Sequence, residues 1–141
     1  MLVRLLYASR AVNNNSADLV NSIMAQARVH NPPQGLTGIL CFSGDMFIQV
    51  LEGGRDAVNA LYTHILRDPR HHGVQILQYE EITERRFGGW TMGQVNLAKL
   101  NTAVLLKYSE LPVLNPFVVS GAVSMALLDD LIATASICGR A

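Results

Sequence analysis

Short apolar runs bounded by turn residues predict the strands of this chain. The first run covers residues 2–9 and has the length of a strand. Two further apolar runs flank the tripeptide Ser43-Gly44-Asp45, which is typical of a hairpin turn. Two more runs follow in the middle of the chain and are separated by a polar loop. The predicted strands are 2–9, 36–43, 46–52, 74–82 and 90–96.

Two segments between these strands have apolar residues at helical spacing. The first helix is predicted from Asp18 to Asn31, because Pro32 disfavours helical geometry at the residue before it. The second helix is predicted from Val58 to about Asp68. This order of elements predicts an α+β fold, a ferredoxin-like βαββαββ sheet with both helices on one face.

The chain changes character after residue 97. Prolines interrupt this part, and residues 121–137 predict an apolar helix with Val123, Leu127 and Leu131 on one stripe. Since both earlier helices are expected on one face of the sheet, this helix would cover the bare face; a dimer or partner surface is the alternative. We therefore expect a domain at 1–97 and a helical extension at 98–141.

Composition narrows the class of protein. Half of the 141 residues are apolar, so a core is available. The formal net charge is +0, which argues against a protein whose main task is to bind nucleic acid but leaves weak or local contacts open. Cys41 and Cys138 are expected to be free thiols in a reducing compartment, with one long-range disulfide as the alternative. The start of the chain lacks a signal-peptide pattern, and Asp129 and Asp130 interrupt the C-terminal apolar run. We expect a cytoplasmic protein without membrane contact.

Strand alternation brings one polar pair into the predicted core. Gln49 lies between apolar residues on one face of its strand, and Tyr7 holds the same place in the first strand. Burying an amide without a partner costs about 1–3 kcal/mol, so Gln49 needs a hydrogen-bonding neighbour. Tyr7 is the candidate if the first and third strands pair. Alternation alone favours a simple satisfied core pair over a reactive one.

The two helices supply a second candidate site. Ile23, Ala27 and His30 share one face of the first helix, and Ile65 shares a face of the second with His64 and Asp68. A slot between the helices would have aliphatic walls and polar edges, which suits a planar heteroaromatic ligand. The alternative is a plain core contact with solvated polar neighbours. The pair His71-His72 lacks a spaced Cys or carboxylate, so no metal site is predicted.

Five motifs along residues 2–96 decide between these interpretations. Together they resemble the BLUF family of flavin-binding blue-light photoreceptors, in the family's order and at its spacing. The motifs are the strand with Tyr7, His30-Asn31 followed by GLTGIL, FIQVLEG at 47–53, DPRHH at 68–72 and RRFGGWTM at 85–92. A single one of them would be weak, since LTG or LEG occurs by chance.

The resemblance implies a non-covalent flavin between the two helices. Tyr7 would exchange an electron and a proton with the photoexcited ring, and Gln49 would lie between Tyr7 and that ring. Asn31, His64 and Asp68 would hold the pyrimidine edge, while Ile23 and Ile65 would sandwich the ring. Arg70 and His71 or His72 would lie near the phosphate chain. The implied flavin contacts are Tyr7, Ile23, His30, Asn31, Gln49, His64, Ile65, Asp68, Arg70 and His71.

The family's signalling output is implied in the same way. Light would rearrange the hydrogen bonds of Gln49 without net redox chemistry, and Trp90 and Met92 of the fifth strand would relay the change. FAD is the expected cofactor, with FMN or riboflavin as alternatives. We expect no enzymatic activity and a homo-oligomer that signals to a separate protein, such as a cyclic-dinucleotide phosphodiesterase or a response-regulator-like protein.

Two positions depart from some relatives, and two other function classes stay open. His64 stands where some relatives have Arg, and Ala27 where some have Ser, which could change the spectrum or the recovery rate. A cofactor-free ferredoxin-like module that binds protein or RNA is the main alternative, although its sheet would need exposed aromatic residues. An acylphosphatase-like enzyme would need an Arg in a phosphate-binding loop, and Gly53-Gly54-Arg55 resembles such a loop only weakly.

Overall fold

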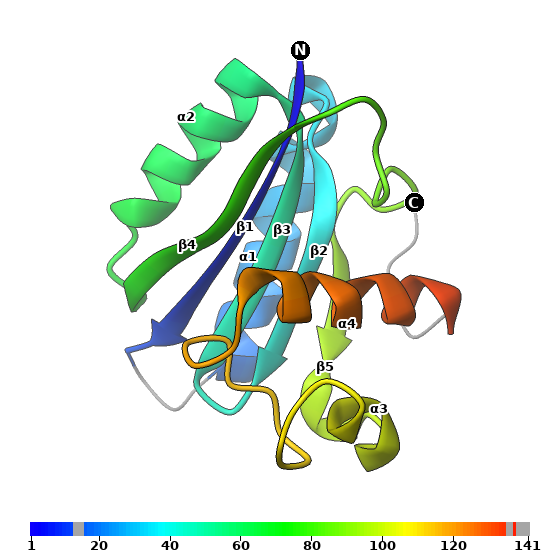
Figure 1. The fold of residues 1–141 in the computed structure, drawn as a ribbon. Helices are drawn as coiled ribbons and strands as arrows, with labels where there is room; N and C mark the ends of the chain where they lie inside the picture. Colours follow the sequence, from blue (N-terminus) through cyan, green and yellow to red (C-terminus); the bar gives the residue numbers. More distant parts are fainter. Residues whose placement is uncertain (13–15, 135–136, 138–141) are drawn as a thin grey trace.

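The protein is a five-stranded sheet with helices on both faces (Figure 1). A computed structural model describes residues 1–12, 16–134 and 137. The elements in chain order are β1 (Leu2–Ala11), α1 (Ser16–His30), η1 (Pro32–Gln34), β2 (Thr37–Ser43), β3 (Met46–Gly54), α2 (Arg55–Leu66), β4 (His71–Ile82), β5 (Gly93–Asn96), η2 (Leu97–Lys99), α3 (Thr102–Leu106) and α4 (Gly121–Ala133).

The strand order is β4-β1-β3-β2-β5. All neighbouring strands are antiparallel except β2 and β5, which are parallel. The β2–β3 hairpin turns through Gly44, whose φ of 58° lies in the region that favours glycine. The predicted α+β, ferredoxin-like fold is confirmed.

The two faces of the sheet build two separate cores. Alternation turns Val3, Leu5 and Leu51 toward α1 and α2, where they pack with Met24 and Val58. The intervening residues of the same strands point the other way and pack against α4, which crosses in front of the sheet while α1 lies behind it (Figure 1). This second core includes Leu6, Ile48, Val50, Leu127, Leu128 and Leu131. The expected cover of the second face by the C-terminal helix is therefore present.

Several predicted boundaries need correction. β1 extends to Ala11 and β4 begins at His71, because Arg10 and Ala11 continue to pair with His72 and His71. α2 begins at Arg55, and α4 ends at Ala133.

The fifth strand is shorter than its apolar pattern predicted. It begins at Gly93, which pairs with Ile39 of β2, so Trp90 and Met92 lie in the loop before β5 and not in the strand. Both side chains are nevertheless buried, at 7% and 2% exposure, which explains why the pattern resembled a strand.

Cys41 is a buried free thiol, and burial raises its pKa to about 12. Cys138 lies outside the described residues. Within the described part of the chain, every helix is too short or too polar to cross a membrane.

The core under α4 predicts a large effect for Leu131, which has no exposed surface. Leu131→Ala should lower the free energy of unfolding by about 2–5 kcal/mol, because it leaves a cavity between α4 and the sheet. Leu111→Ala is the matched control, since Leu111 is 67% exposed, and it should change stability by less than about 0.5 kcal/mol. Urea unfolding measures both; equal effects would contradict the packing of α4 on the sheet.

Candidate functional site

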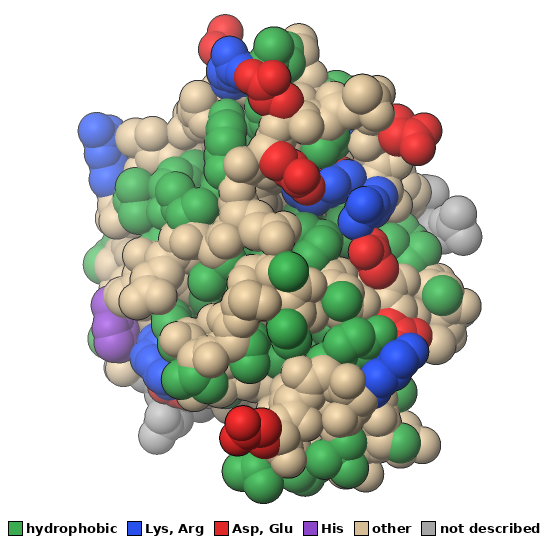
Figure 2. All heavy atoms as spheres, viewed as in Figure 1, with side chains coloured by type: hydrophobic (Ala, Val, Ile, Leu, Met, Phe, Trp, Pro, Cys, Tyr) green, Lys and Arg blue, Asp and Glu red, His purple; other side chains and the backbone are tan. Residues whose placement is uncertain are grey.

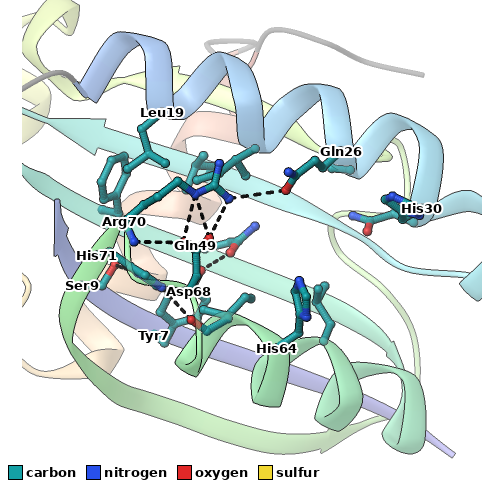
Figure 3. A pocket seen from close by; sticks show the side chains of 17 residues that line it. Tyr7, Ser9, Leu19, Gln26, His30, Gln49, His64, Asp68, Arg70 and His71 are labelled. Atoms are coloured by element: carbon teal, nitrogen blue, oxygen red, sulfur yellow. Dashed lines mark hydrogen bonds and ion pairs between the residues drawn. The ribbon is translucent and has the colours of Figure 1, made fainter. Parts of the chain in front are cut away.

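A cavity of about 330 Å³ lies between α1 and α2, above β1 and β3 (Figure 3). Its side walls are aliphatic, with Leu19 and Ile23 from α1 and Leu61 and Ile65 from α2. Polar side chains lie on its floor, at its edges and at its ends. Aliphatic walls with a few convergent polar groups are typical of a site for a flat aromatic ligand, and the volume falls in the range of small-molecule pockets.

Tyr7 and Gln49 form the polar part of the floor. They are direct partners in the β1–β3 ladder, and each is 4% exposed. The Tyr7 hydroxyl donates a hydrogen bond to Gln49 Oε1. Gln49 Nε2 in turn donates to Met92 Sδ at 3.4 Å. The oxygen of the Gln49 amide is therefore bonded to a phenol, and its nitrogen to a thioether.

Burial keeps the Tyr7 phenol protonated. Loss of solvent raises the pKa of Tyr7 far above its ordinary value, and the neighbouring Tyr62 and Asp68 raise it further. The Tyr62 ring lies 5.8 Å from the Tyr7 ring between centroids. Tyr7 is therefore a neutral donor that can lose its proton only if it also loses an electron or meets a strong acceptor.

Arg70 joins the two sides of the cavity. Its guanidinium donates to Asp68, with Nε–Oδ1 at 2.9 Å and Nη2–Oδ2 at 2.6 Å (Figure 3). Arg70 Nη1 also donates to Ser22 Oγ of α1 at 2.8 Å. Nη2 reaches Gln26 Oε1 of the same helix at 3.4 Å. The hydrogen bond and charge of Arg70 lower the pKa of Asp68, so this carboxylate stays ionised beside the cavity.

His71 is held by both of its ring nitrogens. Nε2 lies 2.7 Å from the Ile65 carbonyl oxygen and Nδ1 lies 2.9 Å from Ser9 Oγ. A carbonyl only accepts, so Nε2 carries a proton and donates, and in the neutral ring Nδ1 accepts from the Ser9 hydroxyl. These contacts connect the end of α2 to β1 and β4 at the base of the cavity.

Asn31, His30 and His64 lie toward one end of the cavity. Asn31 is 4% exposed, and its Nδ2 donates to the Thr91 carbonyl oxygen at 3.5 Å. The backbone carbonyl oxygen of Asn31 accepts a hydrogen bond from the Leu36 N–H at 3.0 Å, and this bond holds the turn after α1. His30 and His64 are exposed and extend from opposite helices (Figure 3).

The ten predicted flavin contacts all line this one cavity. Trp90 and Met92 do not line it, and they lie on different sides of the sheet. Met92 belongs to the core under α1 and α2, whereas Trp90 belongs to the core under α4. Met92 is therefore the residue of the two that faces the site.

Sequence reasoning missed several lining residues. Leu19 and Leu61 precede Ile23 and Ile65 by one helical turn, and Ser9 and Phe47 lie two residues from Tyr7 and Gln49 on the same strand faces. The periodicity that found the named residues could therefore have found these as well. The missed lining residues are Ser9, Leu19, Gln26, Leu40, Phe47 and Leu61.

A family model described as "Sensors of blue-light using FAD" (BLUF) matches residues 2–93. The chain belongs to the BLUF family. The match includes every residue that lines the cavity.

Related sequences carry light-dependent functions in their names. The chain is 34% identical over 88 residues to the blue light- and temperature-regulated antirepressor BluF of Escherichia coli (strain K12), covering 62% of this chain and 22% of that protein. It is 37% identical over 92 residues to the photoactivated adenylate cyclase subunit beta of Euglena gracilis, covering 64% and 11%. The chain thus matches only a small part of these relatives.

Two solved structures of similar size match almost end to end, and a longer one matches over part of its length. The dark-state structure of BlrB has a TM-score of 0.79 and 34% identity, covering 95% of this chain and 96% of that one. The photo-activated state of BlsA has a TM-score of 0.83 and 30% identity, covering 94% and 95%. Klebsiella pneumoniae BlrP1, with FMN and cyclic diGMP, has a TM-score of 0.68 and 36% identity over 76% of this chain and 29% of that one.

These similarities identify residues 2–93 as a sensor domain of the blue-light, flavin-using type. They favour this interpretation over the RNA-binding and acylphosphatase-like alternatives. The cavity fits a flavin, because its aliphatic walls suit the faces of the ring while the amides, histidines and Asp68 supply hydrogen bonds for its polar edge.

The lowered pKa of Asp68 predicts an acid dependence of stability. A carboxylate whose pKa is lower in the folded state stabilises the fold above its unfolded value, 3.8, and loses that contribution as the pH falls through the lowered value. The stability difference between wild type and Asp68→Asn should therefore be constant above about pH 5 and shrink in more acidic solution. Thermal unfolding of both proteins across pH measures it, and a pH-independent difference would contradict the Asp68–Arg70 pair.

Proposed function

We propose that this chain binds FAD in the cavity between α1 and α2, and that blue light changes the hydrogen bonding of the Gln49 amide. The observation that carries the proposal is the buried series Tyr7–Gln49–Met92 along the cavity floor. FMN and riboflavin share the ring that this cavity fits, and FAD is preferred because the family is described by it.

The residues around the cavity would have separate tasks. Ile23 and Ile65, from opposite helices, would contact the two faces of the ring. Asn31, His64 and Asp68 would offer hydrogen bonds to the polar edge. The other polar lining groups, Arg70, His71 and His30, would contact the ring edge and the chain that leaves it.

A bound flavin supplies absorption of blue light and, once excited, an acceptor for one electron. Tyr7 is suited to donate that electron, because its phenol is buried beside the cavity and its proton already lies in a hydrogen bond to Gln49. Loss of the electron would make the phenol strongly acidic, so its proton would move along the hydrogen bond to Gln49 Oε1. Return of the electron and the proton would restore Tyr7, so no net oxidation would occur.

A changed arrangement of the Gln49 amide would persist after the electron and the proton have returned to Tyr7. The two ends of the amide have nearly the same shape but opposite hydrogen-bonding sense, so the side chain can turn over or tautomerise within the same space. A turned amide would direct its oxygen at Met92 Sδ, which can accept but not donate a hydrogen bond. The Gln49–Met92 contact would then be lost, and the loop before β5 would be released from the site.

The signal would leave through β5 and residues 98–141, which we propose act as the output extension. Figure 2 shows hydrophobic side chains gathered at the lower end of the α4 face, where α3 and the segment after it lie in Figure 1. Leu106, Leu111 and Val113 of this part are 50%, 67% and 57% exposed. Such exposed apolar side chains suit contact with another protein.

The partner would be a separate protein, and the chain would form homo-oligomers. Relatives include a light-regulated antirepressor, and BlrP1 is described with cyclic diGMP. A cyclic-dinucleotide phosphodiesterase or a response-regulator-like protein is therefore the class of partner that we propose.

The central experiment is the absorption spectrum of the purified protein supplied with FAD. We expect flavin absorption in the dark and a reversible shift of that absorption to longer wavelength under blue light, because the ring gains a stronger hydrogen bond. Protein that stays colourless with FAD, FMN and riboflavin would refute the proposal. A bound flavin with an unchanged spectrum under light would refute it as well.

Gln49→Leu and Tyr7→Phe separate binding from photochemistry. Both variants should retain flavin, because the aliphatic walls and polar edges remain, and both should lose the light-induced shift. Gln75→Leu is the control, since Gln75 is exposed on β4, and it should keep a normal shift. Absorption spectra before and after illumination decide the outcome, and a normal shift in Gln49→Leu would remove the amide from the mechanism.

A further inference from the structure

Glu52 is a fully buried carboxylate that the flavin site does not use. It lies on β3 with no exposed surface, three residues after Gln49 and on the opposite face of the strand. A buried charge is costly unless it is paired and hydrogen-bonded. The groups that satisfy Glu52 therefore have to stay in place as long as it remains ionised and buried.

Three N–H donors converge on Glu52. Arg4 Nε donates to Oε2 at 2.7 Å, and this guanidinium is itself buried. The other two donors are backbone groups of the loop 83–92, which joins β4 to β5. Phe87 N–H donates to Oε1 at 2.6 Å, and Arg86 N–H donates to Oε2 at 3.1 Å. The Glu52 carboxylate thus holds the loop 83–92 through two backbone N–H groups of that loop.

The same loop meets β3 again on the other face of the sheet. Five residues after Phe87, Met92 Sδ accepts the hydrogen bond of Gln49 Nε2. Between these contacts, the Trp90 carbonyl accepts the backbone N–H of Gly38 at 3.0 Å. One strand therefore fixes one loop at two points, with the photoactive amide at one and a buried charge at the other.

From this arrangement we propose that Glu52 is a positioning residue of the light sensor, which sets where Met92 meets Gln49. This inference rests on the proposed photochemistry of Gln49. After illumination, the dark state returns only when Met92 lies again at the amide. Glu52 limits the positions that the loop can take, so it speeds this return.

Glu52→Gln tests the proposal with a side chain of the same shape. One amide oxygen replaces two carboxylate oxygens, and the new NH₂ group opposes an N–H donor. In the FAD-loaded protein, recovery after blue light should slow by about threefold or more, the effect of losing one hydrogen bond. In cofactor-free protein, hydrogen exchange of the Arg86 and Phe87 amides should be faster than in wild type.

Two further variants separate positioning from loss of the ion pair. Glu80→Gln removes the other carboxylate that pairs with Arg4, at 2.9 Å, but does not contact the loop, and it should recover like wild type. Arg4→Gln with Glu52→Gln removes both buried charges, so it avoids a stranded guanidinium and decides the question if Glu52→Gln alone does not fold. This double variant should also recover slowly.

The outcomes are distinct. Slow recovery in both variants that lack Glu52, with normal recovery in Glu80→Gln, supports the positioning role. Normal recovery in the double variant, or slow recovery in Glu80→Gln, overturns it. If wild type itself shows no light-induced shift, the proposed function fails together with this role. A normal photocycle in all of the variants removes only the role of Glu52.

Discussion

The contact between Tyr7 and Gln49 is the interaction on which the arrangement of this protein depends. It exists because β1 and β3 pair in a register that sets these two residues side by side. A slip of one residue between these strands would turn one of the two side chains to the α4 face and leave the other at the cavity. It would also move the apolar residues of the slipped strand into the opposite core. The same packing that stabilises the sheet therefore fixes the phenol and the amide at the floor of the cavity.

The two faces of the sheet differ in how they are packed. Toward α1 and α2, the core opens into a cavity whose walls are aliphatic and whose ends are polar. Arg70 pairs with Asp68, which follows the end of α2, and also donates to Ser22 of α1. The two helices are therefore linked by an ion pair and hydrogen bonds as well as by packing. Toward α4, the core is closed and includes Phe87 and Trp90 of the loop 83–92. This loop is thus part of both sides.

Local pattern in the sequence was enough for the elements and for most of the site. Alternation placed Tyr7 and Gln49 on one face, and helical spacing placed Ile23 and Ile65 on facing walls, because these relations depend only on the geometry of one strand or helix. The roles of these residues came from the family resemblance and not from the pattern.

What local pattern could not supply is contact between distant residues. Glu52 and Arg4 are 48 positions apart, and nothing near either residue indicates that they pair inside the protein. The start of the fifth strand was predicted wrongly for a related reason. Trp90 and Met92 are buried by the two opposite cores and not by strand pairing, so an apolar run was mistaken for a longer strand.

The shortness of β5 has a further consequence. Four residues pair it to β2 in parallel, at the edge of the sheet, whereas β1 is paired along nearly its whole length on both sides. Local opening requires the loss only of the contacts made by the segment that opens, so an edge strand with few ladder bonds opens far more often than the central strands. The strand that follows the loop 83–92 is thus the one that the sheet can lose at the smallest cost in paired backbone.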